Sequence, residues 1–193
     1  MIREGSSMNT YDFDQTVFQP DSSFSFVMYC LRHYPRAVLH SVPGMSVVGL
    51  QRLMKKAETK ELKEKIFSFL PRLDDVDRIV EEFWETHRDR LAPWYLAQKR
   101  SDDVIISASP DFLLRPICEE LGVFLIATRM DPYTGKIHGL NCHDEEKVRR
   151  FRQEFPDGHT ENFYSDSLAD SPMAKIADRA FLVRDGKPGP WPD

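Results

Sequence analysis

The chain has 193 residues, of which 41% are hydrophobic and 30% are charged. These values are ordinary for a soluble globular protein with one substantial domain, or with one domain that carries a large insertion. The formal net charge of -5 argues against a surface for nucleic acids or anionic membranes, because both select basic patches. We therefore expect no nucleic-acid partner.

Three cysteines, Cys30, Cys118 and Cys142, are odd in number and far apart. This pattern favours the reduced thiols of a cytoplasmic protein over a disulfide framework or a zinc site. No signal peptide is visible, and residues 1–8 are polar. We expect them to be a leader or an expression scar before a natural start at Met8, and we assign them to no structural domain.

No apolar run reaches the ~20 residues that cross a bilayer. The nearest candidate, residues 37–50, is short and is interrupted by His40, Pro43 and Gly44. We expect no transmembrane segment, while peripheral contact with a membrane stays open.

The first large part of the chain, residues 21–100, has a helical pattern. Apolar residues recur at helical spacing in segments 23–34, 49–70 and 74–91, and prolines separate these segments. The charged run 55–65 is interpreted as the solvated face of a helix. This part contains no motif that identifies a ligand.

The rest of the chain alternates between strands and helices. Ser109 is a plausible N-cap and Pro110 a plausible first residue for the first of these helices. We expect strands at 103–109, 123–131, 161–167 and 179–185, and helices at 110–122, 145–155 and 171–178. Such alternation predicts an α/β fold with a three-layer, Rossmann-like parallel sheet, to which an opening strand around Tyr11 also belongs.

The opening strand contains two acids in the sequence YDFDQTVF. Residues i and i+2 of a strand point to the same side, so Asp12 and Asp14 are expected to project together. At the carboxyl end of a parallel strand they would reach the crevice where open α/β sheets bind ligands. Acids of a simple turn at the end of a strand explain this short segment equally well.

Later segments add other polar groups at the ends of strands. Ser107 ends the run VIIS just before a helix, where free N–H groups suit a phosphate oxygen. Lys147 lies near the start of a helix, where a cation opposes the helix dipole and so favours a role outside the helix. Asp166 and Asp170 follow the strand in ENFYSDS, and Asp170 could also introduce the next helix.

These residues lie in four segments: YDFDQTVF, VIISASP, NCHDEEKVRR and YSDSLADSPM. In this order they resemble the motifs of the haloacid dehalogenase (HAD) superfamily, from Asn9 to Val183. They are most similar to the branch of the phosphoserine phosphatases, subfamily IB, and within it to phosphatidylglycerophosphate phosphatases of the C type. The helical insertion looks like the type C1 cap of that superfamily, so we expect a core domain of residues 9–20 and 101–193 and a cap domain of residues 21–100.

The resemblance implies roles for the first motif. Asp12 would be the nucleophile that takes the phosphoryl group, and Asp14 the general acid and then the general base. The backbone carbonyl of Asp14 would also bind a metal ion, and Thr16 would fix the loop and help bind the phosphate. Because carbon–halogen hydrolases of the superfamily lack an acid at the position of Asp14, this residue favours phosphate chemistry.

The other motifs would complete the site. Ser107 and Ala108 would bind the phosphoryl oxygens, and Lys147 would offset the charge of the nucleophile and the phosphate. Asp166 would hold Mg²⁺ together with Asp12 and Asp14, and Asp170 would support them through water or Lys147. Magnesium prefers oxygen ligands and keeps waters, which suits a site of carboxylates, and it explains how four acids can share one crevice.

Three positions depart from the family pattern. Gln15, Asp144 and Ser165 stand where glycine is frequent, and none of them removes a reacting group. The sequence thus predicts a cytoplasmic, Mg²⁺-dependent phosphatase that acts on a small soluble phosphate ester. A peripheral lipid-phosphate phosphatase and a non-catalytic protein that binds a phosphorylated ligand remain alternatives.

Overall fold

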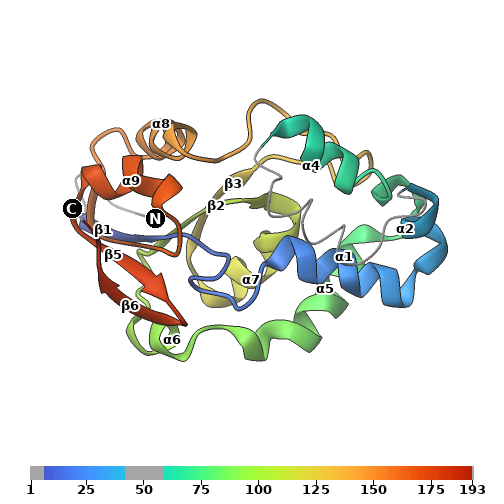
Figure 1. The fold of residues 1–193 in the computed structure, drawn as a ribbon, viewed down its shortest axis with the longest axis horizontal. Helices are drawn as coiled ribbons and strands as arrows, with labels where there is room; N and C mark the ends of the chain where they lie inside the picture. The colour runs from blue at the N-terminus through green and yellow to red at the C-terminus, as the bar shows by residue number, and fades with distance from the viewer. Residues whose placement is uncertain (1–6, 42–58, 193) are drawn as a thin grey trace.

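The computed structural model describes residues 7–41 and 59–192, and its centre is a six-stranded sheet (Figure 1). The strands stand in the order β3-β2-β1-β4-β5-β6; the first five are parallel, and β6 is antiparallel to β5. They are β1 (Ser7–Tyr11), β2 (Val104–Pro110), β3 (Phe124–Thr128), β4 (His159–Ser165), β5 (Ala177–Arg184) and β6 (Lys187–Pro190). The expected Rossmann-like parallel sheet is confirmed, and β1 lies at its centre.

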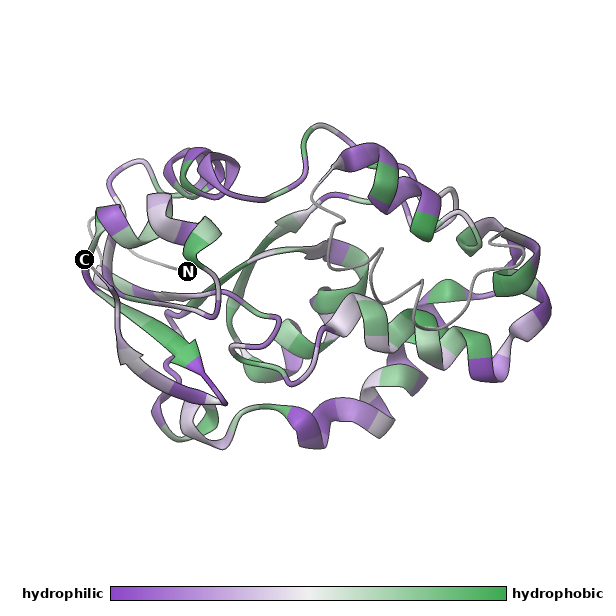
Figure 2. Ribbon diagram, viewed as in Figure 1, coloured by the Kyte–Doolittle hydropathy of each residue, from purple (hydrophilic) through white to green (hydrophobic). Residues whose placement is uncertain are grey.

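Two apolar clusters cover the two faces of the sheet. Within β2, Val104 and Ile106 belong to one cluster and Ile105 to the other, as strand alternation requires. Helices α8 (Glu145–Glu154) and α9 (Ser171–Ile176) lie on the face of Val104, and α7 (Asp111–Leu121) lies on the opposite face. Figure 2 shows that α8 is mostly hydrophilic whereas β5 is mostly hydrophobic.

The remaining helices come from the expected cap. They are α1 (Ser22–His33), α2 (Pro35–Ser41), α4 (Lys60–Ile66), η1 (Leu70–Arg72), α5 (Val76–His87), η2 (Arg88–Arg90) and α6 (Pro93–Gln98). Figure 1 shows α1, α2 and α4 at the end of the molecule farthest from β6.

The expected cap and core share one apolar cluster. The indole Nε1 of Trp84 in α5 donates to the carbonyl of Leu113 in α7 at 2.6 Å. The ring of Tyr95 in α6 packs edge-on against the ring of Tyr11 in β1, with ring centroids 4.9 Å apart. The domain division at residues 20 and 100 therefore stays a prediction, although α6, within the expected cap, packs against β1.

Two elements differ from those expected, and a local sequence signal explains the second difference. The first helix after β2 begins at Asp111, with Pro110 as its N-cap, instead of at Pro110 with Ser109 as its N-cap. Strand β6 was not expected; it follows a two-residue turn in which Asp185 and Gly186 have φ of 50° and 71°. An Asp-Gly pair favours such a hairpin turn because both residues need positive φ.

Two sequence predictions lie partly outside the described residues. Of the apolar run 37–50, residues 37–41 belong to α2 and residues 42–50 are not described. Of the polar start, Ser7 and Met8 open β1, where Met8 is buried and pairs with Thr160, so those two residues belong to the fold. Among the described helices, none combines the length and the apolar character that crossing a bilayer requires.

Candidate active site

A cavity of about 370 Å³ opens at the carboxyl ends of β1, β2 and β4. The predicted site residue Thr16 lies buried in the loop after β1 and does not line the cavity. The predicted site residues that line it are Asp12, Asp14, Ser107, Ala108, Lys147, Asp166 and Asp170. Acids from the ends of β1 and β4 thus border one space.

A buried ammonium joins two of these acids. Lys147 is only 2% exposed, and its Nζ donates to Asp12 Oδ1 at 2.7 Å and to Asp170 Oδ2 at 2.8 Å. Burial by itself lowers the pKa of Lys147, but the two carboxylates outweigh it and the net shift is upward. Burial raises the pKa of Asp12, and Lys147 opposes that rise. Lys147 therefore stays charged next to the candidate nucleophile.

A turn places the two acids of the first motif. Strand β1 ends at Tyr11, so strand alternation does not position Asp12 and Asp14, contrary to the sequence argument. Instead the chain turns back at once, with the N–H of Phe18 donating to the carbonyl of Phe13 at 2.9 Å. The buried rings of Phe13 and Phe18 stack at 5.8 Å and anchor this turn in the core.

The carboxylate of Asp14 has two hydrogen-bond donors from distant segments. The backbone N–H of Ser22 donates to its Oδ1 at 2.6 Å, and the hydroxyl of Ser109 donates to its Oδ2 at 2.5 Å. Ser109 was expected to cap a helix, but its side chain is turned toward Asp14 instead. The end of β2 and the first residue of α1 thus meet at this acid.

The end of β2 is held by a lysine from α4. Ser107 is buried, and its Oγ accepts the N–H of Ser109 at 3.0 Å. The Nζ of Lys63 donates to the carbonyl of Ala108 at 2.5 Å and to Asn141 Oδ1 at 3.0 Å. Burial lowers the pKa of Lys63 to about 8. The prediction of a solvated face at 55–65 is therefore wrong for Lys63, because its side chain is buried against the end of β2; residues 55–58 are not described.

The end of β4 supplies the last two acids. Asp166 is half-buried, and its pKa is raised to about 6 by burial and by the nearby charges of Asp170 and Asp14. The hydroxyl of Ser165 donates to Asp170 Oδ2 at 2.7 Å. Asp170 therefore contacts Lys147 directly, and the serine that replaces a frequent glycine helps to orient it.

The charge of the cavity fits a divalent cation. Among the described residues that line the cavity, five acids (Asp12, Asp14, Asp21, Asp166 and Asp170) stand against two lysines, Lys63 and Lys147. Repulsion from neighbouring acids contributes to the raised pKa of Asp12 and of Asp166. Among the described residues, no three His, Cys, Asp or Glu side chains form a metal site by themselves. Magnesium is commonly bound by one or two carboxylates plus waters and substrate phosphate, so a magnesium site does not require three protein side chains.

Among the lining residues that the sequence analysis did not assign to the site are Asp21, Lys63 and Ser109. Asp21 is the N-cap of α1, and its pKa is raised to about 7 by burial and by Asp14. No sequence signal distinguishes Lys63 from its charged neighbours. The position of Ser109 two residues after Ser107 was the one available hint, because alternate residues of a strand share a side.

The departures from glycine at Gln15 and Asp144 have a conformational meaning. Gln15 has φ of 58°, and Asp144 has φ of 54° with ψ of -130°. Glycine adopts such angles without the steric cost that a Cβ imposes. At both positions this chain adopts these angles with a residue that has a Cβ, and the Cβ strains the backbone.

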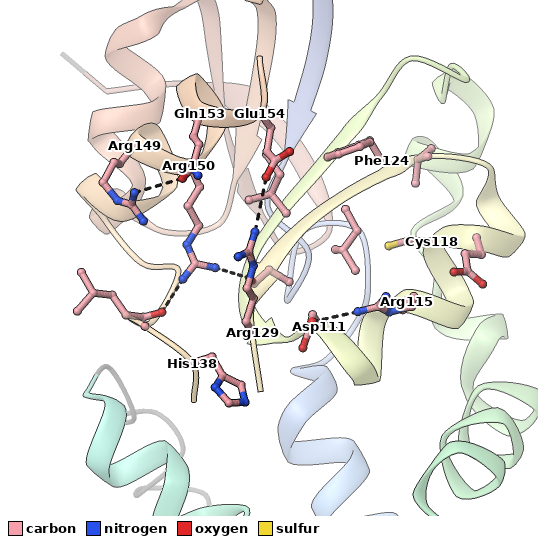
Figure 3. A pocket seen from close by; sticks show the side chains of 17 residues that line it. Asp111, Arg115, Cys118, Phe124, Arg129, His138, Arg149, Arg150, Gln153 and Glu154 are labelled. Atoms are coloured by element: carbon pink, nitrogen blue, oxygen red, sulfur yellow. Dashed lines mark hydrogen bonds and ion pairs between the residues drawn. The ribbon is translucent and has the colours of Figure 1, made fainter. Parts of the chain in front are cut away.

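A larger cavity of about 560 Å³ lies elsewhere, along β3 between α7 and α8 (Figure 3). None of the predicted site residues lines it. Arg150 donates to the carbonyls of Ala127 and Leu140, at 2.6 Å each, and Arg129 pairs with Glu154 at 3.7 Å. Both arginines are therefore held by contacts within the protein, Arg150 by two carbonyls and Glu146, and Arg129 by Glu154, so this cavity is not our candidate active site.

Known proteins resemble this chain over most of its length. Protein CicA of Caulobacter vibrioides is 30% identical over 194 residues, which cover 92% of this chain and 86% of that protein. The crystal structure of a protein with unknown function from Bordetella pertussis Tohama I has a TM-score of 0.70 and 24% identity, and covers 90% of this chain and 88% of its own.

A third similar structure is a phospho-aspartyl intermediate analogue of phosphoserine phosphatase, with a TM-score of 0.56 and 15% identity over 92% of this chain and 86% of that one. At such identities the two structural matches show a shared fold. The model of the family described as haloacid dehalogenase-like hydrolase matches residues 10–175, a span that begins just before Asp12 and ends just after Asp170. The chain therefore belongs to the haloacid dehalogenase-like hydrolases.

Proposed function

We propose that this protein is a Mg²⁺-dependent phosphomonoester hydrolase that works through an aspartyl-phosphate. The observation that carries the proposal is the buried contact of Lys147 with Asp12 and Asp170 at the rim of a sheet, in one cavity with Asp14 and Ser107. This arrangement holds a carboxylate nucleophile beside a permanent positive charge.

The reaction would have two steps. In the first, Asp12 Oδ attacks phosphorus, the bond from phosphorus to the ester oxygen breaks, and a proton from Asp14 goes to the departing alcohol. In the second, water attacks phosphorus, Asp14 takes a proton from that water, and the bond to Asp12 breaks to release inorganic phosphate. Lys147 and the N–H groups at the end of β2 would stabilise the charge on the phosphoryl oxygens, and Ser107 would orient them.

The carboxylates of Asp12 and Asp166 and the carbonyl of Asp14 would hold the magnesium ion. When bound, Mg²⁺ supplies positive charge to the phosphoryl oxygens. Asp170 would act one step away, by keeping Lys147 charged and directed at Asp12.

The lining of the cavity supports a small polar substrate. Among the described residues that line it, Ala108 is the one apolar member, and Asp21 and Lys63 add an acid and a cation from the cap side. Such a surface suits a hydrophilic metabolite better than an acyl chain, since binding apolar groups requires apolar contacts. The likeness to a phosphoserine phosphatase fold supports a phosphate ester of this kind, and we propose that the chain belongs to the phosphoserine phosphatase-like subfamily IB.

The test is a panel of phosphate esters assayed with Mg²⁺ and with EDTA. It includes p-nitrophenyl phosphate, sugar phosphates, phosphoamino acids, nucleotides and phosphatidylglycerophosphate in vesicles. We expect Mg²⁺-dependent release of phosphate from soluble esters by the wild type, and none by Asp12→Asn. Turnover of the vesicle substrate alone would favour the lipid-phosphate alternative, and binding without turnover would favour a non-catalytic role.

A further inference from the structure

The hydroxyl of Ser109 connects Asp14 to the first turn of the cap. It donates to Asp14 Oδ2 at 2.5 Å, and it lies 2.8 Å from the hydroxyl of Ser23 and 3.2 Å from the hydroxyl of Ser22. Ser109, Ser22 and Ser23 are all buried. Three hydroxyls from segments 86 or more residues apart therefore meet at one carboxylate.

The number of protons fixes the direction of these bonds. A serine hydroxyl has one donor and two acceptor sites. Because Ser109 spends its proton on Asp14, the hydroxyls of Ser22 and Ser23 must donate to Ser109. The three hydroxyls therefore form one directed set of hydrogen bonds that ends on Asp14 Oδ2.

The other oxygen of Asp14 has a different partner. The backbone N–H of Ser22 donates to Oδ1 at 2.6 Å, and a backbone N–H can only donate. The two oxygens of Asp14 are thus held by two different donors, one from α1 and one from β2. Two donors on a planar carboxyl group fix its orientation.

We propose that Ser109 is a positioning residue that fixes the orientation from which the carboxyl group of Asp14 exchanges its proton with the leaving group. The proposal rests on the proposed phosphatase function. Ser109 itself touches no reacting atom and acts through Asp14. Since Ser22 and Ser23 belong to α1, the seating of the cap helix also sets the orientation of the acid.

A proton that is badly placed matters most for a poor leaving group. p-Nitrophenolate departs without a proton, but an alkoxide needs one as the bond to phosphorus breaks. The ratio kcat/KM covers the steps up to departure of the leaving group. Loss of the Ser109 hydroxyl should therefore lower kcat/KM for an alkyl phosphate much more than for p-nitrophenyl phosphate.

The experiment compares Ser109→Ala, Ser109→Thr and Ser23→Ala with the wild type on p-nitrophenyl phosphate and on the alkyl phosphate that turns over fastest in the panel. General acid catalysis contributes about 10²- to 10⁴-fold. For Ser109→Ala we expect a fall of about 30-fold on the alkyl ester and of less than about 3-fold on the aryl ester. Ser109→Thr keeps the hydroxyl and should recover much of the loss. Ser68→Ala, which removes a hydroxyl bonded to the carbonyl of Lys65 in the cap, is the matched control and should leave both ratios unchanged.

The outcomes separate the two proposals. An equal fall for both esters in Ser109→Ala, in protein with wild-type circular dichroism, means a merely structural role and overturns the positioning role alone. If Ser109→Ala does not fold, Ser23→Ala decides: a selective loss on the alkyl ester supports the proposal, and equal or unchanged ratios overturn it. A wild type inert on both esters refutes the phosphatase function, and the positioning role with it.

Discussion

Replacing Lys147 by methionine is a direct test of the charge balance in the cavity. Lys147→Met keeps the length of the side chain but removes the ammonium between Asp12 and Asp170. At 2.7 Å and an effective dielectric constant of about 20, each contact carries a gross attraction of about 6 kcal/mol, much of which the desolvation of the ions cancels. Removing one partner from a buried ion pair typically costs about 3–5 kcal/mol.

We expect the loss to depend on pH. Burial already raises the pKa of Asp12 in the folded protein, and loss of Lys147 raises it further. A folded-state pKa above the unfolded value means that the folded chain binds the extra proton, so stability falls as the pH rises through that window. Lys147→Met should therefore lose about 3 kcal/mol of unfolding free energy at pH 8 and about half of that at pH 5.

Urea unfolding followed by circular dichroism at pH 5 and pH 8, without metal, measures both values. Lys175→Met makes the same chemical change at an exposed position of α9 and should stay within about 0.5 kcal/mol of the wild type. If Lys147→Met is as stable as Lys175→Met at pH 8, the ammonium does not compensate the buried carboxylates, and our account of the site fails.

Three further predictions concern other residues. Asp103 is buried, and burial raises its pKa to about 6, so the folded protein binds an extra proton below that pH. The substitution Asp103→Asn should therefore raise the free energy of unfolding in urea by about 2 kcal/mol at pH 8 and leave it unchanged at pH 4. Asp144→Gly should melt higher than Asp144→Ala by an amount that corresponds to about 1 kcal/mol, because its φ of 54° strains any side chain; equal melting temperatures would contradict this strain. Mg²⁺ should raise the melting temperature more at pH 8 than at pH 5, because it binds deprotonated carboxylates, and Asp166→Asn should abolish most of that rise; an undiminished rise would exclude Asp166 as a ligand.

The sequence alone determined the layers of this protein and the order of its first five strands along the chain, but not β6. Alternation of short apolar runs with amphipathic segments predicts a parallel sheet covered on both faces, because each element must bury its apolar side. Gly122, in the left-handed conformation with φ of 69°, ends α7 where the sequence placed the end of that helix. The positions of Asp12 and Asp166 directly after strands were also predictable, since the ends of parallel strands meet at one edge, whereas Ser107 lies inside β2, which continues to Pro110.

Only the tertiary structure decided which side chains touch. The contact of Lys147 with Asp12 joins residues 135 positions apart, and that of Ser109 with Asp14 joins residues 95 positions apart. Periodicity reports which way a side chain faces within its own element, but it carries no information about the partner that packing brings opposite. For this reason the sequence predicted a helix cap at Ser109 and a solvated side chain at Lys63. In the structure, the packing of α1 and α4 against the sheet gives each of them a buried partner.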